Sequence, residues 1–143
     1  GARIYGIEST ARWRATEALL LDGTVSWSRP RGFTEDGTQK LDEKPAWLGT
    51  GTAVYETDVG VSIMAQGRYI GGVFARNENN RFVQLPSSLV MDVRVSYDLT
   101  PVMGGTTSSL YVRANNVTDD ARFVGLGLPG PGRSFRVGFE VTL

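Results

Sequence analysis

Hydrophobic and polar residues alternate with a period of two along most of this chain. The alternation is unbroken over the last ten residues, where one parity carries Phe135, Val137, Phe139, Val141 and Leu143. The other parity carries Ser134, Arg136, Gly138, Glu140 and Thr142. A period of two is that of a β-strand with one apolar and one polar face.

The same alternation recurs along the chain, and each stretch of it predicts one strand. The expected strands are about Arg3–Arg14, Glu17–Arg29, Ala46–Glu56, Val61–Gly71, Leu89–Leu99, Ser108–Asn116 and the terminal stretch just described. Few windows have a helical period, and β-branched and aromatic residues crowd the patterned stretches. The sequence therefore predicts an all-β fold, an antiparallel up-and-down meander of about seven strands.

The connections between these strands alternate between short and long. Short turns are expected near Ala15, Asp58 and Thr100. Long polar loops are expected at Pro30–Pro45, Gly72–Pro86 and Thr118–Gly132, all above the usual hairpin length. A meander then has its short turns at one end and its long loops at the other. That arrangement is typical of transmembrane β-barrels, which have short periplasmic turns and long extracellular loops.

Charged and aromatic residues keep to opposite parities of the predicted strands. The charges lie on the polar parity, at Asp22, Arg68, Asp92, Arg94, Asp98, Arg136 and Glu140. The aromatic residues lie on the apolar parity near strand ends, at Trp13, Trp27, Trp47, Tyr69, Tyr97 and Phe135. A barrel that faces outer-membrane lipid places aromatic girdles at these positions. A soluble sandwich or lipocalin-like barrel also alternates, with its apolar face inward; loop alternation, aromatic placement and strand length favour the membrane barrel.

Composition removes several classes of function. The chain has 143 residues, enough for one domain, with 15 basic and 15 acidic residues, so nothing points to a nucleic-acid partner. Histidine and cysteine are absent, which excludes disulfides, thiol nucleophiles and imidazole bases. No apolar run is long enough for a spanning helix, and no signal peptide opens the chain. Gly1 is therefore expected to begin either a processed protein or a piece of a larger one.

The remaining chemical candidates have ordinary explanations. Asp36, Asp42 and Glu43 do not have the spacing of an EF-hand loop, so we expect a solvated loop and no metal. The glycine-rich run Gly125–Gly132 is not followed by a helix, which leaves a phosphate cradle unsupported. No acidic pair has a catalytic frame. We expect no catalytic residue, no cofactor and no enzymatic activity.

Short motifs resemble those of TonB-dependent outer-membrane receptors. The run Asn115-Asn116-Val117-Thr118-Asp119-Asp120 resembles the motif that ends the penultimate strand in that family. Pro131-Gly132-Arg133-Ser134-Phe135 resembles the opening of its last strand, and Ile4-Tyr5-Gly6-Ile7-Glu8 resembles its recurring Gly-x-Glu strand. Leu85-Pro86 before a patterned strand also fits. The order and spacing of these motifs cover essentially the whole chain.

The final residues are also similar to the C-terminal assembly signal of bacterial outer-membrane barrels. A polar residue and a glycine precede two hydrophobic positions, here Arg136, Gly138, Val141 and Leu143. The usual last residue is aromatic, and Leu143 departs from that. A strand of this kind is recognised by strand addition to the assembly machinery.

The resemblance implies more than the residues show. Family members are barrels of about 22 strands with a plug, and they import siderophores, cobalamin or oligosaccharides with energy from TonB. Residues 1–143 would be a C-terminal section of such a barrel, from a fragment or a split receptor, without the plug and the N-terminal strands. Its partners would be outer-membrane lipid, the remaining strands and plug, TonB through the plug segment, and a small nutrient. The alternatives are a soluble all-β binding module, or another outer-membrane barrel of the autotransporter or porin-like kind.

Two groups of residues are candidates for function in such a barrel. Those expected to face the lumen are Arg68, Asp92, Arg94, Arg113, Arg136 and Glu140. They either contact the substrate or, as we favour, form a charged ladder between wall and plug. Those expected in extracellular ligand loops are Arg76, Asn77, Arg81 and Arg122. They either attract an anionic ligand or are solvated loop residues.

Overall fold

The computed structural model describes residues 1–34, 37–39, 41, 44–79, 81–121, 123–125 and 127–142. Seven long strands follow one another through a single antiparallel sheet in chain order. They are β1 (Ala2–Arg14), β2 (Leu19–Thr34), β4 (Trp47–Glu56), β5 (Val61–Ile70), β8 (Ser88–Asp98), β9 (Thr107–Asn115) and β12 (Ser134–Thr142).

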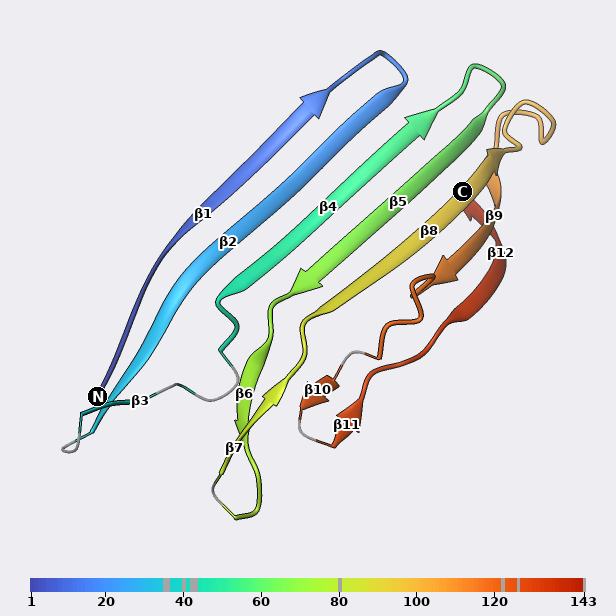
Figure 1. The fold of residues 1–143 in the computed structure, drawn as a ribbon. Helices are drawn as coiled ribbons and strands as arrows, with labels where there is room; N and C mark the ends of the chain where they lie inside the picture. The colour runs from blue at the N-terminus through green and yellow to red at the C-terminus, as the bar shows by residue number, and fades with distance from the viewer. Residues whose placement is uncertain are drawn as a thin grey trace.

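The sheet is one curved layer, with β1 and β12 as its two edges (Figure 1). This confirms the predicted all-β meander of seven strands. Every pairing between consecutive long strands is antiparallel. The described residues contain no helix of the length and hydropathy needed to cross a membrane.

The two ends of the sheet differ in the length of their connections. The short turns after β1, β4 and β8 lie at one end, and the long connections after β2, β5 and β9 lie at the other (Figure 1). The predicted alternation is therefore confirmed. We call these the short-turn end and the long-loop end.

The predicted loops need one correction, because three of them contain strands. Two separate hairpins rise from the long-loop end, β6 with β7 and β10 with β11, and one short strand pairs with β2 alone. The strands are β3 (Gly37–Gln39), β6 (Val73–Arg76), β7 (Phe82–Leu85), β10 (Phe123–Gly125) and β11 (Leu128–Pro129). The first hairpin is supported by Phe74 and Phe82, whose rings meet edge to face at 6.5 Å.

Strand β2 also continues past Pro30, where the sequence predicts a loop. Ser28 donates its backbone N–H to the carbonyl of Ala46, on the β4 side of the strand. Backbone groups two residues apart on a strand point to the same side, so the N–H that Pro30 lacks would also point to the β4 side. Strand β4 does not extend that far, because its first residue is Trp47. No ladder hydrogen bond is lost there, and the strand runs on against β1 to Gly32, which pairs with Ala2.

The register collects the apolar residues of all seven strands on one face. One row across the sheet runs through Tyr55, Ile63, Val95, Val112 and Val137. No second layer covers this row among the described residues. The buried hydrophobic residues of the described part of the chain are only Ala75, Leu85 and Val90, and none of them belongs to the row. The sheet is thus built without a conventional hydrophobic core, and its large side chains face outward.

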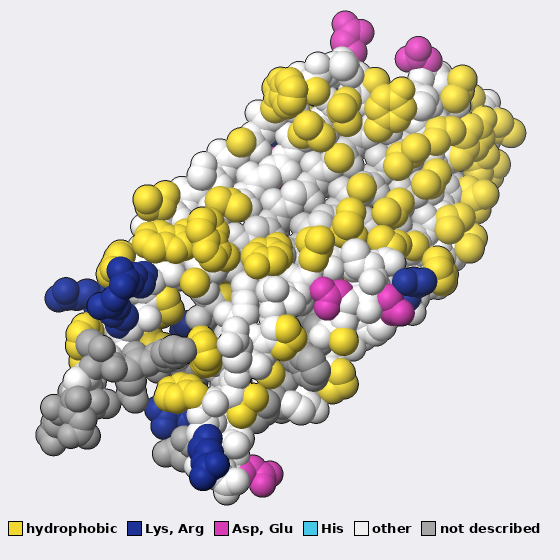
Figure 2. Space-filling view, viewed as in Figure 1, with side chains coloured by type: hydrophobic (Ala, Val, Ile, Leu, Met, Phe, Trp, Pro, Cys, Tyr) yellow, Lys and Arg dark blue, Asp and Glu magenta, His cyan; other side chains and the backbone are white. Residues whose placement is uncertain are grey.

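Aromatic residues lie toward both ends of this apolar face, as the sequence predicts. At the long-loop end, the ring of Trp27 is 6.3 Å from that of Tyr5 and 6.4 Å from that of Trp47. At the short-turn end lie Trp13, Tyr55 and Tyr97, all exposed. Figure 2 shows hydrophobic side chains in two bands with a paler zone between them. The register places Gly23, Gly51 and Gly67 side by side in the middle of this face.

Candidate functional site

The polar face of the sheet carries all six residues that were predicted to face the lumen. Arg94 pairs with Arg113, and Arg113 pairs with Arg136, so these three lie in one row across β8, β9 and β12. Asp92, Arg68 and Glu140 have the same parity on their strands. The register therefore confirms that they share one face, opposite the apolar one.

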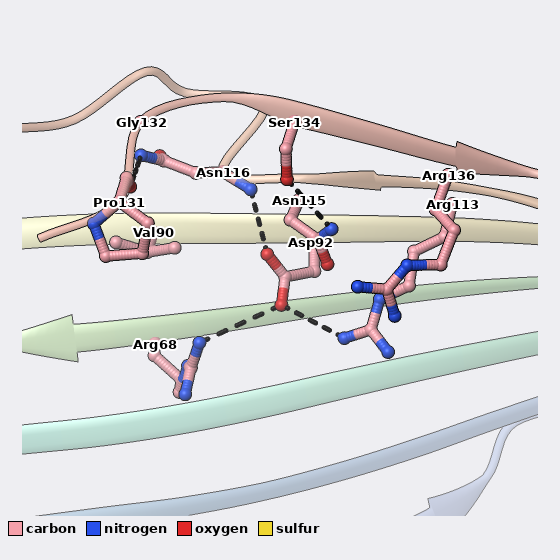
Figure 3. Close-up of a pocket in the computed structure, with 10 residues that line it drawn as sticks. All are labelled: Arg68, Val90, Asp92, Arg113, Asn115, Asn116, Pro131, Gly132, Ser134 and Arg136. Carbon is pink, nitrogen blue, oxygen red and sulfur yellow. Dashed lines mark hydrogen bonds and ion pairs between the residues drawn. The ribbon is translucent and has the colours of Figure 1, made fainter.

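Asp92 is the centre of the first group of polar-face residues. Its Oδ2 is 3.8 Å from Nη2 of Arg68 and 3.4 Å from Nη2 of Arg113. Its Oδ1 accepts a 2.9 Å hydrogen bond from the backbone N–H of Asn116. The carboxylate is 12% exposed, whereas the side chains of Arg68 and Arg113 are 47% and 34% exposed. One nearly buried acid thus holds two half-exposed arginines from neighbouring strands (Figure 3).

Arg136 adds a third guanidinium beside this group. It lies next to Arg113 (Figure 3) and makes no ion pair with any described residue. Arg68, Arg113 and Arg136 line a cavity of about 380 Å³ with Asp92, which is the only acid among the lining residues. We call these four residues the arginine pocket. Three positive charges against one negative charge leave this pocket with an excess of positive charge, which is of the sign that a carboxylate or a phosphate pairs with.

Asn116 closes one side of the arginine pocket and was missed as a site residue. It is 4% exposed and has a left-handed backbone conformation, with φ of 49°, which asparagine adopts more readily than most residues. Its side-chain amide donates to the carbonyls of Asp120 and Pro131 at 3.1 and 3.2 Å. Its side-chain oxygen accepts from the backbone N–H of Asp120 at 3.1 Å. The residue thus ties the end of β9 to the chain that leads into β12.

The rest of the same motif fastens this turn to β8. Thr118 donates its hydroxyl to the carbonyl of Leu89 at 2.8 Å, and Asp120 accepts the backbone N–H of Leu89 at 2.6 Å. Asp119 accepts the backbone N–H of Arg133 at 3.3 Å, just before β12. The Asn-Asn-Val-Thr-Asp-Asp run is therefore a hydrogen-bonded turn that links three strands. The motif is visible in the sequence, where it indicates the family and does not show that its residues lie beside the arginine pocket.

The second polar-face group lies nearer the short-turn end. Arg94 on β8 reaches across β9 to Glu140 on β12, with 2.7 Å between Nη2 and Oε2. The guanidinium of Arg94 lies 4.1 Å from the ring centroid of Tyr111 on β9. These contacts join β8, β9 and β12, and Tyr111 was not predicted to take part.

The same tyrosine explains the glycine of the predicted assembly signal. Gly138 pairs with Tyr111, and a Cβ at position 138 would collide with the tyrosine ring. Arg136 and Val141 lie on β12 as expected, while Leu143 lies outside the described residues. Gly138 thus has a local packing reason, and the role of these residues in assembly stays a prediction.

Three of the four predicted ligand-loop residues, Arg76, Asn77 and Arg81, lie on the hairpin of β6 and β7. Arg76 stacks over the ring of Phe82 at 4.6 Å. The side-chain oxygen of Asn77 accepts the backbone N–H of Asn79 and of Arg81, at 3.1 and 2.9 Å, so Asn77 shapes the hairpin turn. The fourth of these residues, Arg122, lies outside the described residues, and the ligand role stays a prediction.

Metal chemistry has no support in the described part of the chain. No group of three or more acidic residues, histidines or cysteines is placed there to hold an ion. Asp36, Asp42 and Glu43, which are expected to form a solvated loop, lie outside the described residues.

Comparisons with known proteins identify the family of this sheet. A family model described as TonB dependent receptor-like, beta-barrel matches residues 1–117. Among solved structures, the FrpB iron transporter from Neisseria meningitidis (F3-3 variant) matches with a TM-score of 0.69 and 22% sequence identity. The match covers 96% of this chain and 23% of that transporter, so the chain spans about a quarter of the length of the structure it resembles. The chain belongs to the TonB-dependent receptor-like β-barrel family of the bacterial outer membrane, a family of transport receptors and not of enzymes.

Proposed function

We propose that residues 1–143 form part of the wall of an outer-membrane receptor that takes up a scarce nutrient with energy from TonB. The nutrient class is a siderophore, cobalamin or an oligosaccharide. The observation that carries this proposal is the single-layer sheet, whose apolar face is covered by no other described part of the chain. The family supports a place in the outer membrane, and the uncovered apolar face of the sheet supports contact with lipid on that side.

The apolar face is suited to hydrocarbon and not to water. Ile7, Phe135 and Val137 are 71%, 72% and 70% exposed. Leaving one such side chain in water forgoes about 1.5–3 kcal/mol of burial free energy, and this face repeats the exposure on every strand. A soluble binding module would need a second layer over these residues. The outward apolar face therefore argues against that alternative.

The polar face would line the lumen and meet the plug. The arginine pocket has one nearly buried acid and three arginines, and an acidic side chain of the plug would supply the missing negative charge. We favour this role over direct ligand contact, because Asp92 and Asn116 hold the arginines to the turn between β9 and β12. A fixed set of charges on the wall suits a docking contact.

The long-loop end would form part of the extracellular mouth. Arg76 and Arg81 on the β6–β7 hairpin, with Arg122, would attract an anionic ligand, while Asn77 would hold the hairpin turn in shape. The structural neighbour described above is named an iron transporter, so ferric complexes are the first ligands to test.

The other parts of the receptor would complete the barrel. We propose that the chain is a C-terminal section, that other strands pair with the edges β1 and β12, and that TonB acts through a segment of the plug. Arg136, Gly138, Val141 and Leu143 would serve as the signal for barrel assembly.

One experiment tests membrane placement and another tests transport. The parent receptor is expected to fractionate with outer membrane and to require detergent for extraction. Cysteines placed at Val95 and Phe139 should react with a lipid-soluble label, whereas a cysteine at Ser96, on the polar face, should not. A parent protein that stays in aqueous solution without detergent would refute the proposal.

Uptake is measured in cells that lack other receptors for the ligand. Accumulation of a labelled ferric siderophore, cobalamin or oligosaccharide should require both the receptor and TonB. Equal accumulation in cells without TonB would contradict energised transport and favour a porin-like barrel.

A further inference from the structure

Three arginines lie on the apolar face of the sheet, where most of the other residues are hydrophobic. Arg29 and Arg31 continue the odd-numbered series of β2 that includes Val25 and Trp27, and Arg3 precedes Tyr5 on β1. The register pairs Arg3 with Arg31 and Tyr5 with Arg29. We call Arg3, Arg29 and Arg31 the outward arginine cluster. The polar-face arginines of the candidate site have the opposite parity and do not belong to it.

The outward arginine cluster begins where the aromatic band ends. Arg29 is two residues beyond Trp27, whose ring meets Tyr5 and Trp47. Aromatic residues of membrane barrels lie at the level of the lipid headgroups, with hydrocarbon on one side and polar groups on the other. Figure 2 shows Lys and Arg side chains gathered directly beyond the hydrophobic band at this end of the sheet. With the apolar face in lipid, as proposed above, the cluster would lie at headgroup level on the outer surface of the wall.

None of the three arginines makes an ion pair with a described residue, and all three are exposed. Like charges directly opposite each other in a sheet, as Arg3 and Arg31 are, destabilise it unless an anion lies between them. The paired position thus creates a place for a negative group that the described part of the chain does not supply.

A cavity adjoins the cluster and has the lining that a lipid needs. Its volume is about 360 Å³, and it is bounded by Trp27, Arg29, Pro30, Leu41, Lys44 and Phe74. Apolar and aromatic side chains make up most of this wall, and two cations, Arg29 and Lys44, stand at it. A hollow with these two kinds of lining fits a molecule that is part anionic headgroup and part hydrocarbon.

We propose that the outward arginine cluster and Lys44 bind the phosphate groups of a lipid in the leaflet at the long-loop end. Guanidinium groups bind phosphate through paired N–H donors, and such charge-assisted hydrogen bonds are strong at the edge of a low-dielectric medium. The headgroup phosphates contact Arg3, Arg29 and Arg31, and the aliphatic part lies against Trp27 and Phe74. The site rests on the proposed placement of the apolar face in lipid. This leaflet is the outermost one if the long loops are extracellular, which is a separate part of the proposed function.

A bound lipid explains the cluster better than a free anion or an acidic peptide. The arginines continue directly from the aromatic band of the apolar face, so a ligand there also has to cover apolar surface. Inorganic phosphate would satisfy the charges and leave the apolar part of the cavity unfilled. A phosphorylated lipid satisfies both.

The test measures lipid retained by the full-length parent receptor in detergent, by native mass spectrometry. The probe is diphosphoryl lipid A, with its dephosphorylated form and inorganic phosphate as comparison ligands. Wild type should bind the phosphorylated form and lose affinity about tenfold or more when R3Q, R29Q and R31Q are combined. Replacement by lysine, R3K/R29K/R31K, should restore part of the binding, because the charge remains and the paired donors do not.

Arg12 supplies the matched control. It lies on the same strand as Arg3 but has the polar-face parity, so R12Q removes an equal charge and should leave lipid binding unchanged. Equal binding by the triple glutamine variant and wild type would overturn the proposal, as would equal binding of the dephosphorylated lipid. Displacement of the lipid by inorganic phosphate at equal concentration would also overturn it, in favour of a soluble anion.

The outcome is independent of transport. Lipid binding is measured without TonB or nutrient, so a failure of uptake leaves it untouched. The leaflet is tested by cysteine labelling of the β6–β7 hairpin on intact cells. Hairpin cysteines that are shielded from outside, with lipid binding intact, would reverse the proposed orientation and keep the lipid site.

Discussion

Gly138 on β12 lies directly beneath the ring of Tyr111 on β9, its partner in the register. The ring in turn carries the guanidinium of Arg94 from β8 on its face. Three strands are therefore joined through one aromatic ring, and the joint requires that position 138 has no side chain.

This relationship predicts the effect of Gly138→Ala. The added methyl group would push the ring of Tyr111 out of place and loosen its contact with Arg94, at a cost of about 1–3 kcal/mol in the free energy of unfolding. The measurement is thermal unfolding of the refolded receptor in detergent. Gly67→Ala is the control, because a Cβ at position 67 would make only an ordinary van der Waals contact with Met91.

A second variant separates packing from assembly. Combining Gly138→Ala with Tyr111→Ala removes the collision and should restore much of the stability. If Gly138 also serves the assembly signal, the double variant refolds in detergent and still accumulates poorly in the outer membrane. Normal stability of Gly138→Ala alone would show that the ring has another place to go.

Asp92→Asn tests the acid at the centre of the arginine pocket. Asparagine keeps an oxygen for the N–H of Asn116 and removes the charge that holds Arg68 and Arg113. Because both arginines are partly exposed, we expect a loss of only about 1–2 kcal/mol. The variant should also bind carboxylates more tightly, because the one negative charge of the pocket is gone. An isolated plug, or acetate as a small carboxylate, should therefore have a higher affinity for the variant than for wild type. Weaker binding of the carboxylate would contradict a site with excess positive charge.

Asn116 offers a way to separate backbone conformation from hydrogen bonding. Asn116→Gly keeps the left-handed conformation and loses the side-chain hydrogen bonds to Asp120 and Pro131. Asn116→Ala loses both, so it should be the more destabilising, by about 1 kcal/mol over the glycine variant. Urea unfolding of the two variants, side by side, gives the difference. Equal stability would mean that φ at this position contributes nothing.

Two neighbouring residues test which face meets lipid. Val95→Arg places a charge on the apolar face and should cost about 2 kcal/mol or more for insertion into a bilayer. Ser96→Arg places the same charge one residue along, on the polar face, and should insert nearly as well as wild type. Folding yield into lipid vesicles measures both. A reversed order of the two yields would assign the faces the other way round.

The ion pair of Arg94 and Glu140 is expected to contribute little by its charge alone. Glu140 is 54% exposed, so the coupling energy from a double-mutant cycle of Arg94→Gln and Glu140→Gln should be about 1 kcal/mol or less. Arg94→Lys keeps the charge and loses the flat contact with Tyr111. It should be more destabilising than Glu140→Gln, which removes the ion pair and keeps the stacking. The cycle is measured by thermal unfolding in detergent at low and high salt.

The sequence by itself determined the number of long strands, their order and the two faces. Alternation is a local property: Val137 and Phe139 share a face wherever their strand is placed, because successive side chains of a strand point to opposite sides. Loop lengths then determined that the turns after β1, β4 and β8 share one end. The motif at Asn115–Asp120 indicated the family, but it did not show that Asn116 closes one side of the arginine pocket.

Only the tertiary structure decided which residues of different strands meet. Register is set by turn geometry and by pairing along the whole strand, so the sequence could not show that Arg94 reaches Glu140 across β9. Nor could it show that Arg3 lies opposite Arg31 beyond the aromatic band. Pairing also created strands where the sequence showed polar loops, because unpaired backbone groups beyond the main sheet find partners in short hairpins. The two faces of the sheet follow from the period of two within each strand. The sites depend on contacts between strands, which no pattern within one strand can predict.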